Sequence, residues 1–108
     1  MTLEIDPRDA HPLLEGGEAL ALDVREPHEW HVGHIADALH IPLGELGARL
    51  EELPRGRRIV AVCRSGARSG SVVHALRDLG FDVVNLVGGL QRWHASGLPL
   101  EPADGTVA

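Results

Sequence analysis

The only cysteine of the chain lies where an apolar stretch gives way to a short polar loop. Residues 59–62 read IVAV, and Cys63 follows them directly. The next residues, RSGARS, include two arginines, and a helical pattern begins near Ser69. The nucleophile in cysteine chemistry is the thiolate, and nearby cations and a helix N-terminus lower the pKa of a thiol. These residue types and this spacing therefore predict an activated cysteine.

Several backbone N–H groups of this loop are expected to point to one place. Gly66 can adopt conformations that other residues resist, and the first turn of the following helix adds further N–H donors. Converging N–H groups of this kind bind an anion. That anion would be the Cys63 sulfur as a thiolate, or a negatively charged group bonded to it. Arg64 and Arg68 would lower the pKa of the thiol further and attract an anionic substrate.

A plainer interpretation is that Cys63 is a small buried hydrophobic residue, the commonest role of a lone cysteine. Its neighbours here are polar, charged or glycine, and it ends a strand pattern instead of lying within one. These features favour a functional thiol. The two arginines could be ordinary solvated residues, but their position beside a predicted anion site favours a role in binding.

Strand-like and helix-like patterns alternate along the chain. Apolar and β-branched stretches predict strands at 3–5, 19–25, 39–43, 57–62 and 81–87. The alternation predicts an α/β fold, a mostly parallel sheet of about five strands with helices on both faces. Ligand sites in such sheets lie beyond the carboxyl ends of the strands, and Cys63 follows a strand directly.

The helical patterns are of unequal length. A helix from Pro7 is predicted to be short or irregular because it contains Pro12, and a one-sided helix is predicted from Leu43 to Leu53. Residues 26–38 read as an irregular connection with about one helical turn, and 88–97 as a short last helix. The helix after the loop is predicted to bury one face, formed by Val72, Val73, Leu76 and Leu79.

Length and composition indicate one globular domain. We expect this domain to span residues 1–100 and a mobile C-terminal tail to span residues 101–108. The formal net charge of −6 argues against nucleic acid or an anionic membrane as the main partner. There is no apolar run of roughly 20 residues, as a membrane helix needs, no signal-peptide pattern, and no second cysteine for a disulfide. We therefore expect a cytoplasmic protein, most simply a monomer.

Three motifs together resemble the rhodanese family of sulfurtransferases. CRSGARS resembles its active-site loop, LDVREPHEWHVGHIADALHIP (22–42) its upstream signature, and NLVGGLQRW (85–93) its downstream signature. Order and spacing agree across roughly residues 3–100. The resemblance implies the small three-layer rhodanese-like fold. One departure is Asp37-Ala38, where the family often has glycine-alanine.

The resemblance also implies a reaction. Cys63 would be the catalytic nucleophile that takes a sulfane sulfur from a thiosulfate-like donor, forms a persulfide, and passes the sulfur to cyanide or a thiol. No metal or organic cofactor is implied. The implied substrate-binding residues form the rest of the loop: Arg64, Ser65, Gly66, Ala67, Arg68 and Ser69.

Two alternatives stay open. The same loop could serve a non-enzymatic sulfur relay or regulatory module that accepts persulfide from a partner protein. A cysteine-dependent phosphatase or arsenate reductase is disfavoured, because four residues separate Cys63 from Arg68 here and those enzymes have five in between.

Other polar residues have simpler explanations. We expect Asp23, Arg25 and Glu29 to form a structural ion-pair network and not a catalytic acid–base set. Trp93 is expected in the core and His74 in solvent, while the role of Trp30 stays open. Zinc binding is disfavoured for a cluster of four histidines that has no thiol nearby: His28, His31, His34 and His40.

Overall fold

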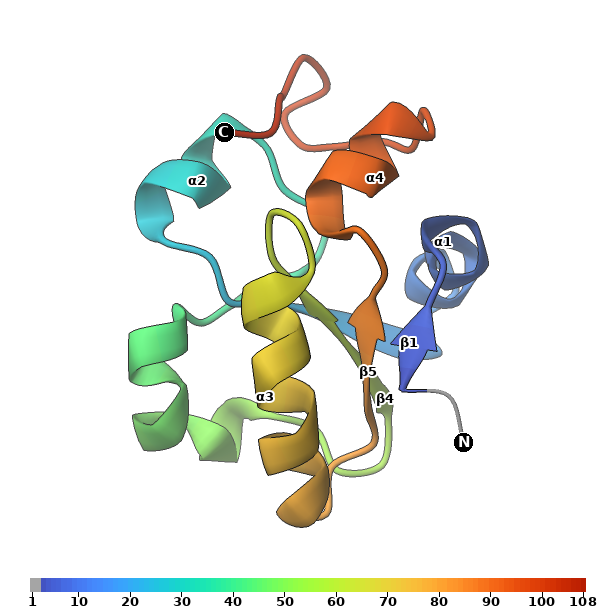
Figure 1. Cartoon of the computed structure of the whole chain (residues 1–108). Coiled ribbons are helices and arrows are strands. Elements are labelled where there is room, and N and C mark those ends of the chain that lie inside the picture. The colour runs from blue at the N-terminus through green and yellow to red at the C-terminus, as the bar shows by residue number, and fades with distance from the viewer. Residues whose placement is uncertain (1–2) are drawn as a thin grey trace.

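A five-stranded sheet forms the centre of the structure, a computed structural model that describes residues 3–108 (Figure 1). The strands are β1 (Glu4–Ile5), β2 (Ala19–Asp23), β3 (Leu39–His40), β4 (Arg58–Val62) and β5 (Val83–Leu86). Their order across the sheet is β1-β5-β4-β2-β3, and every neighbouring pair is parallel. The predicted α/β fold with a parallel sheet is confirmed.

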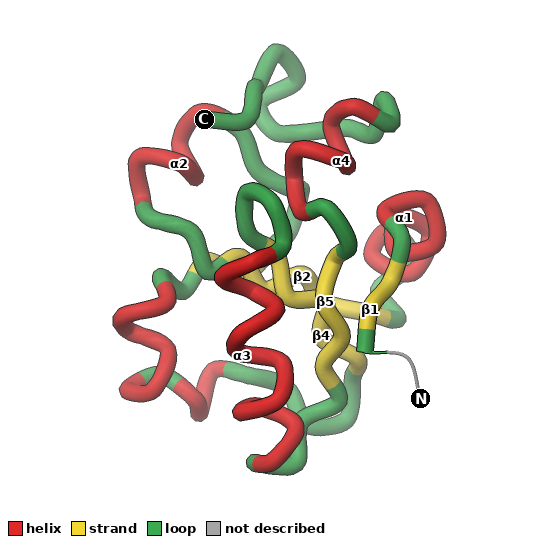
Figure 2. Tube along the Cα trace, in the orientation of Figure 1, coloured by secondary structure: helices red, strands yellow, loops and turns green. Residues whose placement is uncertain are grey.

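Helices cover both faces of this sheet (Figure 2). The α-helices are α1 (Pro7–Glu15), α2 (Pro27–Val32), α3 (Ala67–Asp78) and α4 (Gly89–Ala95), and the 3₁₀ helices are η1 (Leu43–Ala48) and η2 (Leu50–Glu52). Side chains of α3 and the 3₁₀ helices pack on one face, and those of α1 and α4 pack on the other. No helix within residues 3–108 is long and apolar enough to span a membrane.

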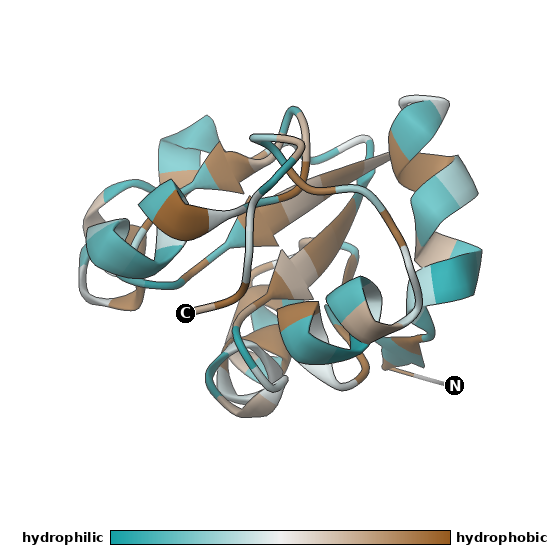
Figure 3. Ribbon diagram, turned by 90° about the horizontal axis from the view of Figure 1, so that it is seen from above, coloured by the Kyte–Doolittle hydropathy of each residue, from teal (hydrophilic) through white to brown (hydrophobic). Residues whose placement is uncertain are grey.

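The strand β4 shows why the sheet is buried on both sides. Successive side chains of a strand point to opposite faces. Accordingly, Ile59 and Ala61 pack with α3, whereas Val60 and Val62 pack with α1 and α4, and all four are fully or almost fully buried. Figure 3 shows mainly brown strands between helices in which brown and teal segments alternate. The central strand is thus anchored in two cores and fixes the position of the loop that follows it.

The predicted helix from Leu43 to Leu53 is wrong in type. The structure has the two 3₁₀ helices η1 and η2 there instead. Gly44 and Gly47 lie inside this segment and disfavour a continuous α-helix, because glycine loses much backbone entropy in a helix. Leu46 and Leu53 are nevertheless buried in the core, as the apolar spacing predicted.

Two helix predictions differ in detail. The helix α1 is short, as predicted, but it continues through Pro12 for nine residues, with the Asp6 carboxylate accepting the Arg8 N–H at 3.0 Å as its N-cap. The prediction that Leu79 lies on the buried face of α3 is wrong. Leu79 follows the last turn of the helix and is 50% exposed.

The C-terminal segment 101–108 runs beside the end of α2. Glu101 and His34 exchange two backbone hydrogen bonds, and the Thr106 N–H donates to the Val32 carbonyl at 2.9 Å. The backbone of Thr106 also lies so close to Gly33 that a Cβ on Gly33 would overlap it. These contacts place the segment on the domain, while its mobility in solution stays a prediction.

Substitution of Gly33 tests whether the segment is held there. We expect Gly33→Ala to lower the free energy of unfolding by about 1–3 kcal/mol, because the new methyl group must displace Thr106. Urea unfolding measures this, with Gly47→Ala as the control, since a Cβ at Gly47 would meet no atom within 4 Å. Equal stability of the two variants would instead support a tail that is detached in solution.

Candidate active site

The thiol of Cys63 lies at the carboxyl end of β4, one residue beyond the strand. Only 1% of the residue is exposed. The strand is flanked by β2 and β5, so the loops after these strands surround the sulfur. Figure 1 shows that the loop between β4 and α3 lies at the same end of the sheet as α2 and α4. The cysteine therefore occupies the sheet edge where α/β folds bind ligands.

Three donor groups lie within hydrogen-bond distance of the Cys63 sulfur, and we call them the anion hole. The N–H groups of Gly66 and Ser69 donate to Sγ at 3.1 and 3.4 Å, and the Ser69 hydroxyl oxygen lies 3.3 Å from it. The helix α3 begins at Ala67, earlier than the predicted start near Ser69, with Gly66 as its N-cap. Gly66 has a φ of +99°, a left-handed conformation that favours glycine.

The electrostatic balance at Cys63 favours the thiolate. Burial acts to raise the pKa of the thiol. Hydrogen bonds from the Ser69 hydroxyl and from the backbone N–H groups of Ser69, Gly66 and Ser65 act in the opposite direction and outweigh burial. The pKa of Cys63 is consequently lower than the ordinary value of a cysteine, as a nucleophilic thiol requires.

The arginines of the loop differ in their surroundings. Arg64 is exposed at the start of the loop. Arg68 instead points to α2, where its guanidinium makes two hydrogen bonds, of 2.7 and 2.8 Å, to the Glu29 carboxylate. These two hydrogen bonds lower the pKa of Glu29 to about 2 and raise the pKa of Arg68. The Arg68 charge is therefore largely offset by a protein carboxylate.

A second ion pair, between Arg25 and Asp23, supports the helix that carries Glu29. The buried Arg25 guanidinium makes a bidentate pair with Asp23, with its shortest contact at 2.8 Å, and donates to the carbonyls of Glu29 and Gly33. Through these bonds the end of β2 holds both ends of α2, which in turn holds Arg68. The predicted pairing of Asp23 with Arg25 is present, whereas Glu29 joins this network through its backbone carbonyl and pairs its carboxylate with Arg68.

The loop after β5 docks onto the cysteine loop. The N–H groups of Leu90 and Gln91 donate to the carbonyls of Cys63 and Arg64 at 2.9 and 3.0 Å. A Cβ at Gly89 would come within 2.6 Å of both carbonyl oxygens, so only glycine permits this approach. The double glycine belonged to the sequence resemblance, but its contact with the cysteine loop was not predicted.

Asn85 is a further residue that the sequence analysis missed. Its side chain lies in β5 and reaches across to the cysteine loop, where Oδ1 accepts the Ser69 hydroxyl at 2.6 Å and Nδ2 donates to the Gly66 carbonyl at 3.0 Å. A polar residue between apolar neighbours in a fully buried strand was the available signal. Such residues need partners, because an unpaired buried amide is destabilising.

The clustered histidines have structural contacts. The ring N–H groups of His34 and His40 donate to the carbonyls of Trp30 and Arg25, at 2.9 and 2.8 Å. Both rings stack on Trp30, with ring centroids 3.7 and 4.6 Å away. Trp93 is buried in the core and His74 is exposed, as predicted. Within residues 3–108, no three histidine, cysteine or acidic side chains gather as a metal site would need.

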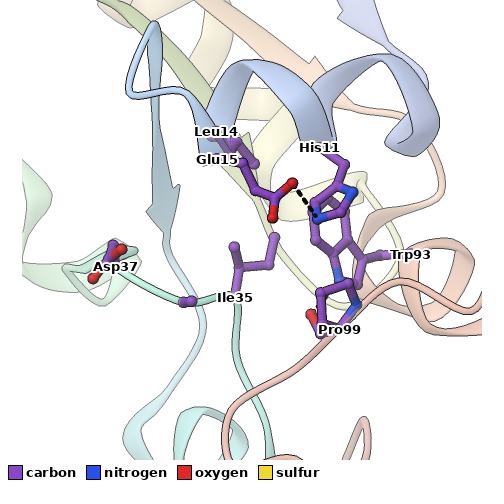
Figure 4. A pocket seen from close by; sticks show the side chains of 8 residues that line it. His11, Leu14, Glu15, Ile35, Asp37, Trp93 and Pro99 are labelled. Atoms are coloured by element: carbon purple, nitrogen blue, oxygen red, sulfur yellow. Dashed lines mark hydrogen bonds and ion pairs between the residues drawn. The ribbon is translucent and has the colours of Figure 1, made fainter.

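A hollow lies away from the cysteine, between α1 and α4 (Figure 4). It has a volume of about 280 Å³, and none of its lining residues belongs to the cysteine loop. His11 and Glu15 approach each other at 3.6 Å along one wall, while Ile35, Trp93 and Pro99 form apolar parts. The Cys63 thiol therefore lies outside this hollow.

The sequence matches the rhodanese-like domain family over residues 6–96. It is 37% identical over 107 residues to a sulfurtransferase of Allochromatium vinosum, and the match covers 97% of this chain and 100% of that protein. It is 34% identical over 101 residues to the thiosulfate sulfurtransferase GlpE of Actinobacillus pleuropneumoniae, with 93% and 94% covered. A rhodanese-related protein from Thermoplasma volcanium has a crystal structure that matches with a TM-score of 0.85 and 34% identity, over 90% of this chain and 95% of that chain. The chain belongs to the rhodanese-like domain family, and its relatives include sulfurtransferases.

The family resemblance predicted from the three motifs is confirmed, and the structure explains the one departure. Asp37 has a φ of +61°, the only positive value at a non-glycine residue within residues 3–108. A glycine suits such a conformation, and aspartate is among the few other residues that adopt it readily. The turn is therefore compatible with aspartate at this position.

The Glu29–Arg68 pair predicts how stability depends on pH. The pKa of Glu29 falls from 4.5 to about 2 in the folded protein, so the pair stabilises the fold above pH 4.5 and this contribution is lost as the pH falls toward 2. Because the Arg68 side chain is 37% exposed, we expect a contribution of about 1–2 kcal/mol. In urea unfolding at a series of pH values, Glu29→Gln should lack this part of the acid dependence. The exposed Glu51→Gln is the control, and an equal change in both variants would contradict the assignment.

Proposed function

We propose that this protein is a sulfurtransferase that moves a sulfane sulfur from a thiosulfate-like donor to cyanide or a thiol through a Cys63 persulfide. The observation that supports the proposal most directly is the anion hole around the Cys63 sulfur. It stabilises a thiolate before the reaction and leaves N–H groups near a negatively charged sulfur bonded to Cys63 afterwards. The thiosulfate sulfurtransferase among its relatives supports the choice of donor.

The proposed reaction has two displacements. The Cys63 thiolate attacks the outer sulfur of thiosulfate, the S–S bond of thiosulfate breaks, and sulfite leaves with its electron pair. The outer sulfur of the resulting persulfide carries the negative charge. A cyanide carbon or an acceptor thiolate then attacks this outer sulfur, and the Cys63 thiolate leaves. The covalent intermediate divides one transfer into two easier steps, each needing only a nucleophile and a stabilised leaving group.

Arg64 and Arg68 should contribute unequally to donor binding. The charge of Arg68 is paired with Glu29, so it acts mainly by holding the loop against α2. Arg64 is exposed, and Arg64 together with Ser65 and Ala67 forms the outer surface of the loop. We propose that Arg64 attracts the sulfonate end of an anionic donor. The other loop residues, Gly66 and Ser69, hold the reacting sulfur.

The geometry also weighs against phosphate chemistry. The N–H groups of Gly66 and Ser69 already point at the cysteine sulfur itself, at 3.1 and 3.4 Å. A phosphatase loop instead surrounds an oxyanion beyond the sulfur, and the spacing of four residues from Cys63 to Arg68 leaves a smaller loop. A single additional sulfur fits this arrangement better than a tetrahedral oxyanion.

The mass of the intact protein tests the persulfide. After incubation with thiosulfate, we expect a gain of one sulfur atom, which cyanide or a reducing thiol removes. Cys63→Ala should gain none, and Cys63→Ser controls for loss of packing at this buried position. A sulfur adduct on Cys63→Ala would disprove the assignment. Steady-state turnover with thiosulfate and cyanide then separates an enzyme from a slow sulfur relay.

Kinetics of Arg64→Ala test its role in donor binding. Loss of an exposed charge near the donor should raise KM for thiosulfate by about three- to tenfold and leave kcat nearly unchanged, because a pair of this kind is worth about 1 kcal/mol. An uncharged persulfide donor should be affected much less. Arg57→Ala provides the control for a general loss of positive charge, because the partly buried Arg57 lies at the opposite end of β4 from the loop. Equal changes in KM for charged and uncharged donors would count against electrostatic attraction.

A further inference from the structure

Asn85 connects the two residues that form the anion hole. It is the third residue of β5, and only 7% of it is exposed. Its backbone pairs with β1 and β4, so the strand fixes its position between the edge strand and the central strand of the sheet. Its side chain bonds to the Gly66 carbonyl and the Ser69 hydroxyl. It makes no hydrogen bond to Cys63, so any effect on the sulfur must pass through these two residues.

The orientation of the Asn85 amide follows from its partners. The Gly66 carbonyl only accepts hydrogen bonds, so the Asn85 NH₂ group must face it. The Asn85 Oδ1 must then accept from the Ser69 hydroxyl, at 2.6 Å. The amide thus holds Gly66 from one side and Ser69 from the other.

The bond to Gly66 stabilises an uncommon backbone conformation. The Gly66 carbonyl accepts from the Asn85 NH₂ group and from the Gly70 N–H, both at 3.0 Å. Two donors on one carbonyl fix the peptide group that follows Gly66. The φ of +99° at Gly66 directs the Gly66 N–H to the Cys63 sulfur. Without Asn85, only the helical bond from Gly70 would oppose rotation of this segment.

The bond to Ser69 controls a single proton. The Ser69 hydroxyl has one hydrogen to share between the Asn85 Oδ1 at 2.6 Å and the Cys63 sulfur at 3.3 Å. With the hydrogen toward Asn85, the Ser69 oxygen can accept the Cys63 S–H of the neutral thiol. With the hydrogen toward the sulfur, it stabilises the thiolate. The bond to Asn85 therefore holds the Ser69 oxygen beside the sulfur before the thiolate forms, and the hydrogen can turn to the sulfur once it does.

We propose that Asn85 is a positioning residue that holds the Gly66 N–H and the Ser69 hydroxyl on the reacting sulfur of Cys63. Its importance for sulfur transfer rests on the proposed function, whereas its effect on the thiol requires no sulfur donor. No bond to the substrate is involved. Asn85 acts by keeping the donors in place before the thiolate forms, so that ionisation needs no rearrangement of the loop.

The surrounding charges are the same with or without the Asn85 amide, since asparagine is uncharged. A change in the titration of Cys63 in an uncharged Asn85 variant would therefore report the loss of hydrogen bonds. The charged and titratable groups nearby come from the loop, α3, α2, β2 and β1: Arg64, Arg68, His74, Glu29, Asp23, Arg25 and Glu4.

Alkylation of Cys63 by iodoacetamide at a series of pH values tests the proposal. Asn85→Ala should shift the titration midpoint upward and slow alkylation below the midpoint by about tenfold, because hydrogen bonds to a charged sulfur are weakened. The rate at high pH, where the thiol is fully ionised, should change little. If Asn85→Ala does not fold, Asn85→Leu is used instead. It keeps most of the side-chain volume, removes both hydrogen bonds, and should show the same shift of the midpoint.

Two further variants separate positioning from packing. Val83→Ala removes buried volume from the same strand beside Ile59, four residues before Cys63, and it should lower the melting temperature but leave the midpoint unchanged. Ser69→Ala should raise the midpoint, and adding Asn85→Leu to it should raise the midpoint by less than in the native background, because part of the Asn85 effect acts through Ser69.

The outcomes are distinct. An unchanged midpoint in folded Asn85→Ala or Asn85→Leu would overturn the proposal, as would an equal shift in Val83→Ala. If the native protein accepted no sulfur from thiosulfate, the proposed function would fail, but alkylation would still decide the role of Asn85. Normal sulfur loading of the native protein together with an unchanged midpoint in the Asn85 variants would leave the proposed function intact and remove Asn85 from it.

Discussion

A negatively charged sulfur buried at the end of a strand is stable only when hydrogen-bond donors point at it, because burial of an unpaired charge costs several kcal/mol. The loop after Cys63 meets this requirement by curling back so that Gly66 and Ser69 face the sulfur. This loop also makes hydrogen bonds to groups outside it, through the Arg68 guanidinium and the Cys63, Arg64 and Gly66 carbonyls. The surrounding elements therefore have to hold it in shape, and much of the structure near the carboxyl edge of the sheet does so.

Three kinds of interaction from outside the loop provide this support. The end of β2 and the helix α2 hold Arg68 through the buried Arg25–Asp23 pair and the partly exposed Arg68–Glu29 pair. The strand β5 supplies the Asn85 amide, and the first turn of α4 donates N–H groups to the loop carbonyls. Ion pairs, a side-chain amide and a helix N-terminus thus act on different atoms of one short segment. Loss of any one leaves the other two in place, whereas loss of β4 itself would remove the anchor of all three.

The sequence was sufficient to predict the parts of the fold that depend on local patterns. The apolar run of β4, the following thiol and the glycine at position 66 predicted a strand, a tight loop and a helix in the right order. The pairing of Arg68 with Glu29 and the bonds of Asn85 were not predicted, because these residues are 39 and 16 to 19 positions from their partners in sequence. The segment 43–53 was assigned the wrong helix type, since leucine spacing alone does not register the effect of two interior glycines.

The docking of α4 onto the cysteine loop gives the protein a built-in reporter of loop opening. The first N–H groups of a helix have no partner within it and usually exchange quickly with solvent hydrogen. Here the Leu90 and Gln91 amides are bonded to the Cys63 and Arg64 carbonyls, so they are exposed only while the two loops separate. Their hydrogen-exchange rates would thus give the free energy of opening of the cysteine loop directly, from two amides that lie outside it.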